Sequence, residues 1–322
     1  MLSGSQRYKW MDMAKFLFAC LIPFLHVEFG KNAAIEFVGQ YMSRLGVPFF
    51  FAFSGMMLSF SIEHRGGSVA LKRFLKRIAK LLIVWLLIDT YYLWINYSRW
   101  DGLRLVQLFL FKTPAFLWFL TSLLVAAVPF CLIKKERHFY LLALLFFAIG
   151  MVLSESYSWL FGEFAGYKRI FLTSRNGLLF AFPMMCVGRW AGKRCFPRSD
   201  GIGLFVASVL LFAEITLVGH KATPNADRSM YFTLPFAMYF LLVALKRLDR
   251  IREIRFDTRF FSDASLAIYL SQILFIDTMN IYLIHTGINR HLLAWLTYIA
   301  ILIVPSAVVL FLRRLRKKDC SR

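Results

Sequence analysis

The sequence predicts an all-α integral membrane protein, a bundle of about ten transmembrane helices with both termini in the cytoplasm. Of its 322 residues, 59% are hydrophobic and 35 are Phe, and the mean hydropathy is +0.61. Long apolar segments recur along the chain, and basic residues gather at the ends of these segments. This composition is typical of proteins whose apolar surface faces lipid.

An apolar helix needs about 20 residues to cross the roughly 30 Å hydrocarbon core of a bilayer. The first such segment follows a basic N-terminus but has no small-residue cleavage site, so we expect it to be retained as a helix. The connecting segments are short, so residues 1–322 are expected to form one membrane domain. The expected spans lie at about 13–30, 45–62, 78–97, 116–133, 139–154, 176–192, 203–219, 230–246, 264–284 and 292–312.

The basic residues predict the orientation of these spans. With the N-terminus inside, 27 of the 39 Lys and Arg residues fall on the cytoplasmic side and 11 on the other, and Lys15 lies in the membrane. Cytoplasmic loops carry such an excess. The net charge of +21 therefore indicates an anionic lipid surface as a partner rather than nucleic acid. The five cysteines show no CxxC spacing, so we expect no disulfide framework and no metal site.

The first span contains Lys15 and His26, and Asp12 lies three residues before Lys15. Ionisable groups inside a bilayer are costly and often mark a functional site. At 100° per residue, Lys15 and His26 differ by about 20° around the helix axis, with about 16 Å of rise between them. Pro23, just before His26, lacks an N–H to donate and invites a local kink. His26 could then act as a general base, because imidazole titrates near neutral pH. The alternatives are a His26 that only packs against a neighbouring helix and a Lys15 that extends to the cytoplasmic interface.

Two further motifs have both a structural and a functional interpretation. In the second span, Ser54 could donate a hydrogen bond inside the bundle, and Gly55 permits close helix contact. Between the second and third spans, cations recur at helical spacing over residues 72–80. This run is either an anchor on anionic lipid or a clamp for a phosphorylated donor.

Two polar residues open the sixth span from the outer side. Arg175 and Asn176 are suited to binding polyhydroxyl groups, and the alternative is a helix N-terminal cap beside a loop cation. Glu214 lies within the seventh span, where an acid needs a partner, and the sequence does not identify one.

In combination, these motifs resemble those of the acyltransferase family 3 membrane proteins, which are typically ten-helix O-acyltransferases of bacterial envelopes. The similarity runs from about residue 8 to residue 312. It rests on Lys15-x10-His26 with the preceding Asp12, on Phe50-Phe-Ala-Phe-Ser54-Gly55, on Leu117-Trp118-Phe-Leu, and on Ser265-Leu-Ala-Ile-Tyr269-Leu. Two positions depart from the family pattern. Arg73-x-x-Lys76 stands where the family has Arg-x-x-Arg, and Gln272 stands where a His often follows Tyr-Leu-x.

The resemblance implies transfer of an acyl group, commonly acetyl, from a cytoplasmic acyl-CoA to a hydroxyl of an envelope glycan or glycolipid. Acetyl-CoA would be a co-substrate, with no permanently bound cofactor, and the protein would sit in the inner membrane. His26 would be the base or acyl carrier, with Asp12 and Lys15 beside it. The resemblance further implies donor binding by Lys15, Arg73, Lys76 and Arg77, acceptor binding by Arg175 and Asn176, and support from Ser54, Trp118 and Tyr269.

A second function from a different class stays open at this point. Membrane domains of the same family are associated with serine racemases, where the domain is thought to supply a small amino acid. Arg-Asn-Gly followed by Phe-Pro, at 175–183, resembles that branch as well. A transporter would carry its substrate without binding CoA.

Overall fold

The computed structural model describes residues 7–27, 29–30, 32–89, 117–164, 173–193, 200–222, 227–283 and 288–319. Every regular element in these ranges is helical, as the sequence predicts. Five helices among the described residues are long and apolar enough to cross a membrane, so the protein is a multi-pass membrane protein. The count of about ten spans and the orientation of the termini stay predictions. The five are Ala34–Arg65, Glu136–Leu153, Asp200–Lys221, Arg259–Met279 and Arg290–Arg316.

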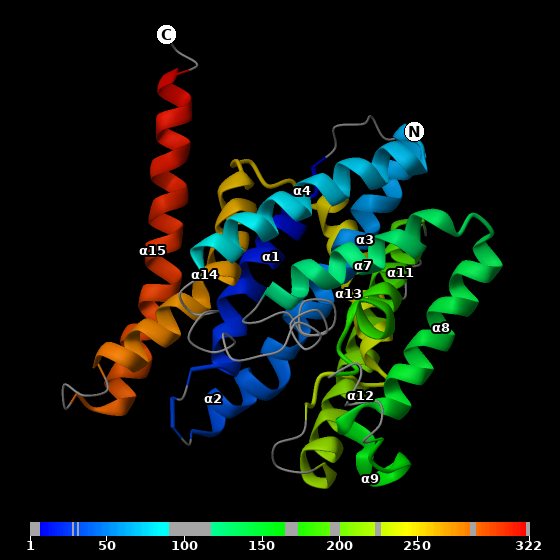
Figure 1. The fold of residues 1–322 in the computed structure, drawn as a ribbon, viewed down its shortest axis with the longest axis horizontal. Helices are drawn as coiled ribbons and strands as arrows, with labels where there is room; N and C mark the ends of the chain where they lie inside the picture. The colour runs from blue at the N-terminus through cyan, green and yellow to red at the C-terminus, as the bar shows by residue number, and fades with distance from the viewer. Residues whose placement is uncertain are drawn as a thin grey trace. The chain divides into compact units, whose positions relative to one another are not determined.

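The chain forms two compact units, and the first combines the two ends of the sequence. It contains the described residues up to Val47 and those from Leu248 onwards. Within it, α14 packs against both α1 and α15 (Figure 1). Its elements are α1 (Lys9–Leu21), η1 (Ile22–Leu25), α2 (Ala33–Phe37), η2 (Val38–Met42), η3 (Ser43–Leu45), α14 (Arg259–Leu283) and α15 (Arg290–Asp319).

The second unit runs from Pro48 to Arg247. The first part of the expected third span at 78–97 coincides with the second half of α4. Its last residues, 90–97, lie outside the described ranges. The elements of this unit are α3 (Gly46–Arg65), α4 (Gly67–Ile88), α7 (Trp118–Leu132), α8 (Glu136–Leu153), η5 (Glu155–Tyr157), α9 (Ser158–Phe161), η6 (Gly177–Ala181), α11 (Phe182–Lys193), α12 (Asp200–Lys221) and α13 (Leu234–Ile251), the last of which ends in the first unit.

The first helix is broken next to Pro23, where the sequence predicts a kink. Its α-helical part ends at Leu21, and a 3₁₀ turn follows over Ile22–Leu25. Pro23 has no N–H to donate, so the regular ladder cannot continue through it. Two carbonyl groups at the break instead accept hydrogen bonds from other elements. The Cys20 carbonyl accepts from the Tyr298 hydroxyl at 3.1 Å, and the Leu21 carbonyl accepts from Ser43 Oγ at 2.6 Å.

This break changes the expected alignment of Lys15 with His26. Each 3₁₀ residue turns about 120° instead of 100°, so four such residues rotate the chain by about 80° relative to an α-helix. The expectation of one shared helical face assumed an uninterrupted helix and is therefore wrong. Broken helices occur at membrane depth where neighbouring elements satisfy the freed backbone groups, as Tyr298 and Ser43 do here.

Helices α3 and α11 approach each other backbone to backbone through a reciprocal pair of glycines. A Cβ atom on Gly55 would lie 2.5 Å from the Met185 Cα, and one on Gly188 would lie 2.6 Å from the Ala52 carbonyl carbon. Neither position has room for a side chain. The prediction that Gly55 permits close helix contact is confirmed.

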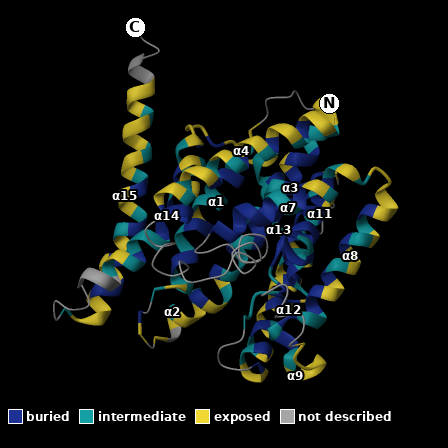
Figure 2. Ribbon diagram, in the orientation of Figure 1, coloured by how far each residue is buried: buried dark blue, intermediate teal, exposed yellow. Residues whose placement is uncertain are grey.

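The surfaces of α12 and α15 are rich in exposed apolar side chains. Both helices are exposed along most of their length (Figure 2). Ile202, Phe205 and Ile303 are each more than 60% exposed. Apolar patches of this extent on a soluble monomer would be unusual, whereas helices that contact lipid present them routinely.

Candidate functional site

A buried polar cluster joins α1 to the start of α14 in the first unit. Lys15 Nζ lies 2.7 Å from Asp12 Oδ1 and donates to Ser262 Oγ at 2.5 Å. Thr258 Oγ1 donates to Asp12 Oδ2 at 2.9 Å, and Arg7 Nε lies 2.5 Å from the same oxygen. The structure therefore brings Asp12 and Lys15 together, and it adds three partners that sequence reasoning missed.

Lys15 does not behave as an isolated snorkelling lysine. Its side chain is only 12% exposed, and Asp12 is 4% exposed as a residue. A buried charge is retained at low cost only when it is paired and hydrogen-bonded, and both conditions hold here. The missed partners had a weak signal in the sequence, since Thr258 and Ser262 are four residues apart and so share one face of a helix.

His26 lies immediately after the break in the first helix. Its backbone N–H donates to the Pro23 carbonyl at 3.0 Å, and the residue is exposed. An imidazole at such a position can receive a proton from a substrate. Tyr269, the supporting residue expected in the same unit, is buried on α14.

The candidate donor site is one side of α4. The buried residues Ala70, Phe74, Ile78 and Leu82 recur every four residues and form its apolar face. Lys72, Arg73, Lys76, Arg77 and Lys80 are all exposed. None of these five cations forms an ion pair with the described part of the chain. The helix thus presents unpaired cations, which suits either phosphate or anionic lipid.

The candidate acceptor residues belong to a polar cluster at the loops of the second unit. The Arg175 guanidinium carbon lies 4.6 Å from the centre of the Trp118 ring, a cation–π contact. Arg175 Nε also lies 3.5 Å from Asp227 Oδ2, and Asp227 accepts from Thr173 Oγ1 at 3.2 Å. Arg175 and Trp118, which the sequence named separately, are thus in contact.

Asn176 caps the helical segment that begins at Gly177. Its side-chain oxygen accepts from the backbone N–H groups of Leu178 and Leu179 at 3.1 and 3.0 Å. Its amide nitrogen donates to the Thr173 carbonyl at 3.1 Å, and the residue is 3% exposed. The capping alternative therefore accounts for both ends of this carboxamide, which leaves Arg175 as the candidate acceptor ligand of the pair.

Glu214 has the partners that the sequence could not supply. It accepts hydrogen bonds from the Tyr157 hydroxyl, from the Thr233 hydroxyl and from the backbone N–H groups of Phe232 and Thr233. The carboxylate thereby ties α12 to the start of α13, where unpaired N–H groups attract negative charge. Burial raises the pKa of Tyr157, and its bond to Glu214 raises it further, so the phenol stays a donor.

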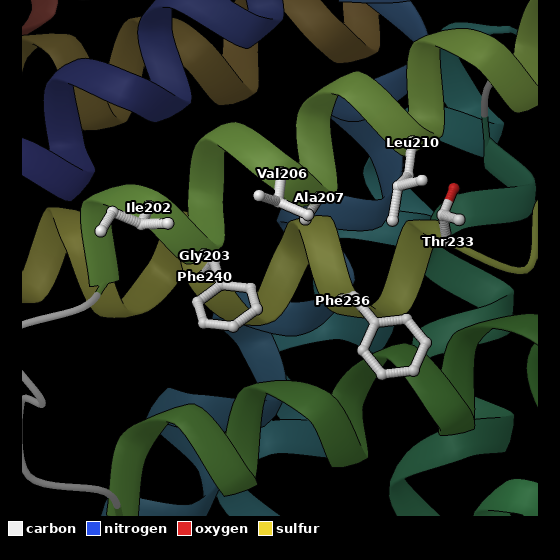
Figure 3. Close-up of a pocket in the computed structure, with 8 residues that line it drawn as sticks. All are labelled: Ile202, Gly203, Val206, Ala207, Leu210, Thr233, Phe236 and Phe240. Atoms are coloured by element: carbon white, nitrogen blue, oxygen red, sulfur yellow. The ribbon is translucent and has the colours of Figure 1, made fainter.

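A groove of about 400 Å³ runs between α12 and α13, and every residue that lines it is uncharged. Figure 3 shows Phe240 of α13 beside Gly203 of α12, with Phe236 further along α13. None of the predicted site residues lines this groove, and its apolar walls offer no acid–base chemistry. Ser54, one of the predicted supporting residues, lies on α3 and is half-buried.

Comparisons with known proteins identify the family. The family model Acyl_transf_3, an acyltransferase domain, matches residues 8–314, nearly the whole chain. No curated protein and no solved structure matches the chain. The family match supports acyl transfer and gives no support to the transporter alternative. From this match and from its apolar helices, we conclude that the chain belongs to the acyltransferase 3 family and is a membrane acyltransferase.

Proposed function

We propose that the protein transfers an acetyl group from cytoplasmic acetyl-CoA to a hydroxyl of an envelope glycan or glycolipid. The observation that carries this proposal is the exposed imidazole of His26 just after a break in the first helix. The buried Asp12–Lys15 pair lies on α1, before this break. Discontinuous helices and intramembrane ionisable groups both mark substrate sites in membrane proteins.

His26 would act as the base or as the acyl carrier. As a base, it takes the proton of the acceptor hydroxyl while a C–O bond forms at the acyl carbon and the C–S bond of the thioester breaks. The thiolate of CoA then takes up the proton. As a carrier, its nitrogen bonds to the acyl carbon first and releases CoA, and the acceptor oxygen displaces the imidazole afterwards.

The cations of α4 support a donor that carries phosphates. Arg73, Lys76 and Arg77 are exposed and lie within five residues of one another on one helix. Guanidinium and ammonium groups make short, charge-assisted hydrogen bonds to phosphate oxygens. Lys15 is held by Asp12 and Ser262, so its ammonium group is fixed in position for an acyl carbonyl.

The contact of Arg175 with Trp118 supports an acceptor that carries hydroxyl groups. The indole offers an apolar face, and the guanidinium offers a planar set of five donors. Asp227 and Ser229 hold the guanidinium in place.

The proposal is tested by release of CoA thiol from acetyl-CoA by purified protein in lipid vesicles. An alkyl glucoside below its solubilising concentration serves as the acceptor. Wild type should release CoA in a sugar-dependent manner, and His26→Ala should lose at least about 100-fold in rate, the lower end of a general base's contribution. His138→Ala, at an exposed histidine on α8, is the matched control and should keep the wild-type rate. Wild-type rates in His26→Ala would refute the role of His26.

A further inference from the structure

Gln272 is a buried carboxamide that has no hydrogen-bond partner among the described residues. It lies on α14 with 0% exposure, and neither Nε2 nor Oε1 is bonded within the described part of the chain. The neighbouring Ser271 Oγ also forms no hydrogen bond with any residue that the structure describes. Buried polar groups are nearly always paired, because leaving one unpaired costs about 1–3 kcal/mol. The carboxamide of Gln272 therefore calls for an explanation.

The packing of α1 on α14 gives the depth of Gln272. Asp12 bonds to Thr258, Lys15 bonds to Ser262, and the two helices therefore run in the same direction. From Ser262 to Gln272 the α-helix rises about 15 Å. From Lys15 to His26 the chain rises about 19 Å, since its last part is a 3₁₀ turn. Gln272 thus lies within about one helical turn of the depth of His26.

A third helix reaches the same layer. The Tyr298 hydroxyl of α15 donates to the Cys20 carbonyl at 3.1 Å, and the Tyr298 ring packs on Phe24 with centroids 4.7 Å apart. The break in the first helix, the unpaired carboxamide and Tyr298 therefore belong to one layer of the first unit. A polar group that is unpaired at this depth is placed where the proposed reaction needs polar contacts.

The chemistry of a carboxamide matches the two groups that meet in acyl transfer. Its oxygen accepts a hydrogen bond, as from an acceptor hydroxyl, and its NH₂ group donates, as to an acyl carbonyl oxygen. It does not titrate, so it does not compete with His26 for the proton. We propose that Gln272 is a substrate-binding residue that hydrogen-bonds the acceptor hydroxyl and the acyl carbonyl during transfer; this inference rests on the proposed function.

The first test uses Gln272→Met to distinguish a role of Gln272 in substrate binding from a role in stability. This change keeps the side-chain volume and removes the unpaired polar atoms. Without substrates, its thermal midpoint should be equal to that of wild type or higher by a few degrees, about 2–4 °C. Transfer from acetyl-CoA to the alkyl glucoside should fall at least about tenfold, which corresponds to about 1.4 kcal/mol. Leu270→Met, at a residue 1% exposed on the same helix, is the matched control and should keep both properties.

The second test is the pH profile of Gln272→Glu. A protonated carboxyl group has a donor and an acceptor, whereas the carboxylate has lost its donor. The ratio of this variant's transfer rate to the wild-type rate at the same pH should therefore rise as the pH falls. A flat ratio would overturn the proposal even if Gln272→Met proved unstable.

A wild-type rate of transfer in Gln272→Met would also overturn the proposal. So would a parallel loss of transfer rate and thermal stability in both Gln272 variants. Absence of transfer by wild type in the same assay would instead refute the proposed function, and the inference with it.

Discussion

The glycine contact between α3 and α11 permits a quantitative prediction for Gly188→Ala. The new Cβ would lie 2.6 Å from the Ala52 carbonyl carbon and closer still to its oxygen. An ordinary contact needs about 3.5 Å, so the two backbones must separate by roughly 1 Å or more. Overpacking of this kind costs about 1–3 kcal/mol or more, against a gain of up to about 1 kcal/mol in helix propensity. We expect a net loss of about 2 kcal/mol.

The measurement is the free energy of unfolding in mixed detergent micelles, compared with a control glycine. Gly201 lies in α12 with no atom within 4 Å of its built Cβ, so Gly201→Ala should be neutral or stabilising. Gly55→Ala should resemble Gly188→Ala, because its Cβ would meet the backbone of Met185. If Gly188→Ala were as stable as Gly201→Ala, the backbone contact between α3 and α11 would be refuted.

Three further predictions concern charged groups. Arg73→Glu should weaken acetyl-CoA binding about tenfold and make it less dependent on salt, because a screened phosphate contact is removed. Arg175→Ala should stop transfer while acetyl-CoA binding is retained, since the contacts with Trp118 and Asp227 would be lost. Asp257→Asn should lower stability by less than about 1 kcal/mol at neutral pH, as for exposed ion pairs. The backbone N–H of Arg259 lowers the pKa of Asp257, so this stability is present above about pH 3.9 and is lost as the pH falls through the lowered pKa.

Each of these predictions has its own control. Arg65→Glu makes the same charge change at the end of α3 and should leave acetyl-CoA binding unchanged. Unchanged affinity in Arg73→Glu would make the α4 cations a lipid anchor only. Loss of donor binding in Arg175→Ala would place both substrates at one site. A stability difference between wild type and Asp257→Asn that persists at pH 2 would show that the effect is not the titration of Asp257.

The helical content and several local features could be predicted because they depend on composition and on nearby residues. The length of the apolar segments predicted the helices, and Gly55 predicted a close helix contact. Pro23 predicted a kink before His26, but the 3₁₀ turn over Ile22–Leu25 could not be predicted from it. It also depends on Tyr298 and Ser43, which lie on other elements and supply the hydrogen bonds at the break.

One part of the candidate site could be predicted because it depends on residues that are close together in the sequence. Asp12 and Lys15 are three residues apart, so their ion pair follows from helix geometry alone. Thr258 and Ser262 complete that cluster from the other end of the chain, and sequence spacing carries no information about such contacts. The capping role of Asn176 is seen only in its hydrogen bonds, because the sequence alone is equally consistent with a cap and a ligand.

The central claim is that His26 serves the transfer of an acyl group from CoA to a hydroxyl. The most direct measurement is the amount of labelled, alkali-labile acetyl ester that forms on the alkyl glucoside from [¹⁴C]acetyl-CoA in vesicles containing equal amounts of wild type or His26→Ala. Labelled ester should form with wild type, and at least about 100-fold less should form with His26→Ala. Equal labelling by the two proteins would contradict the claim.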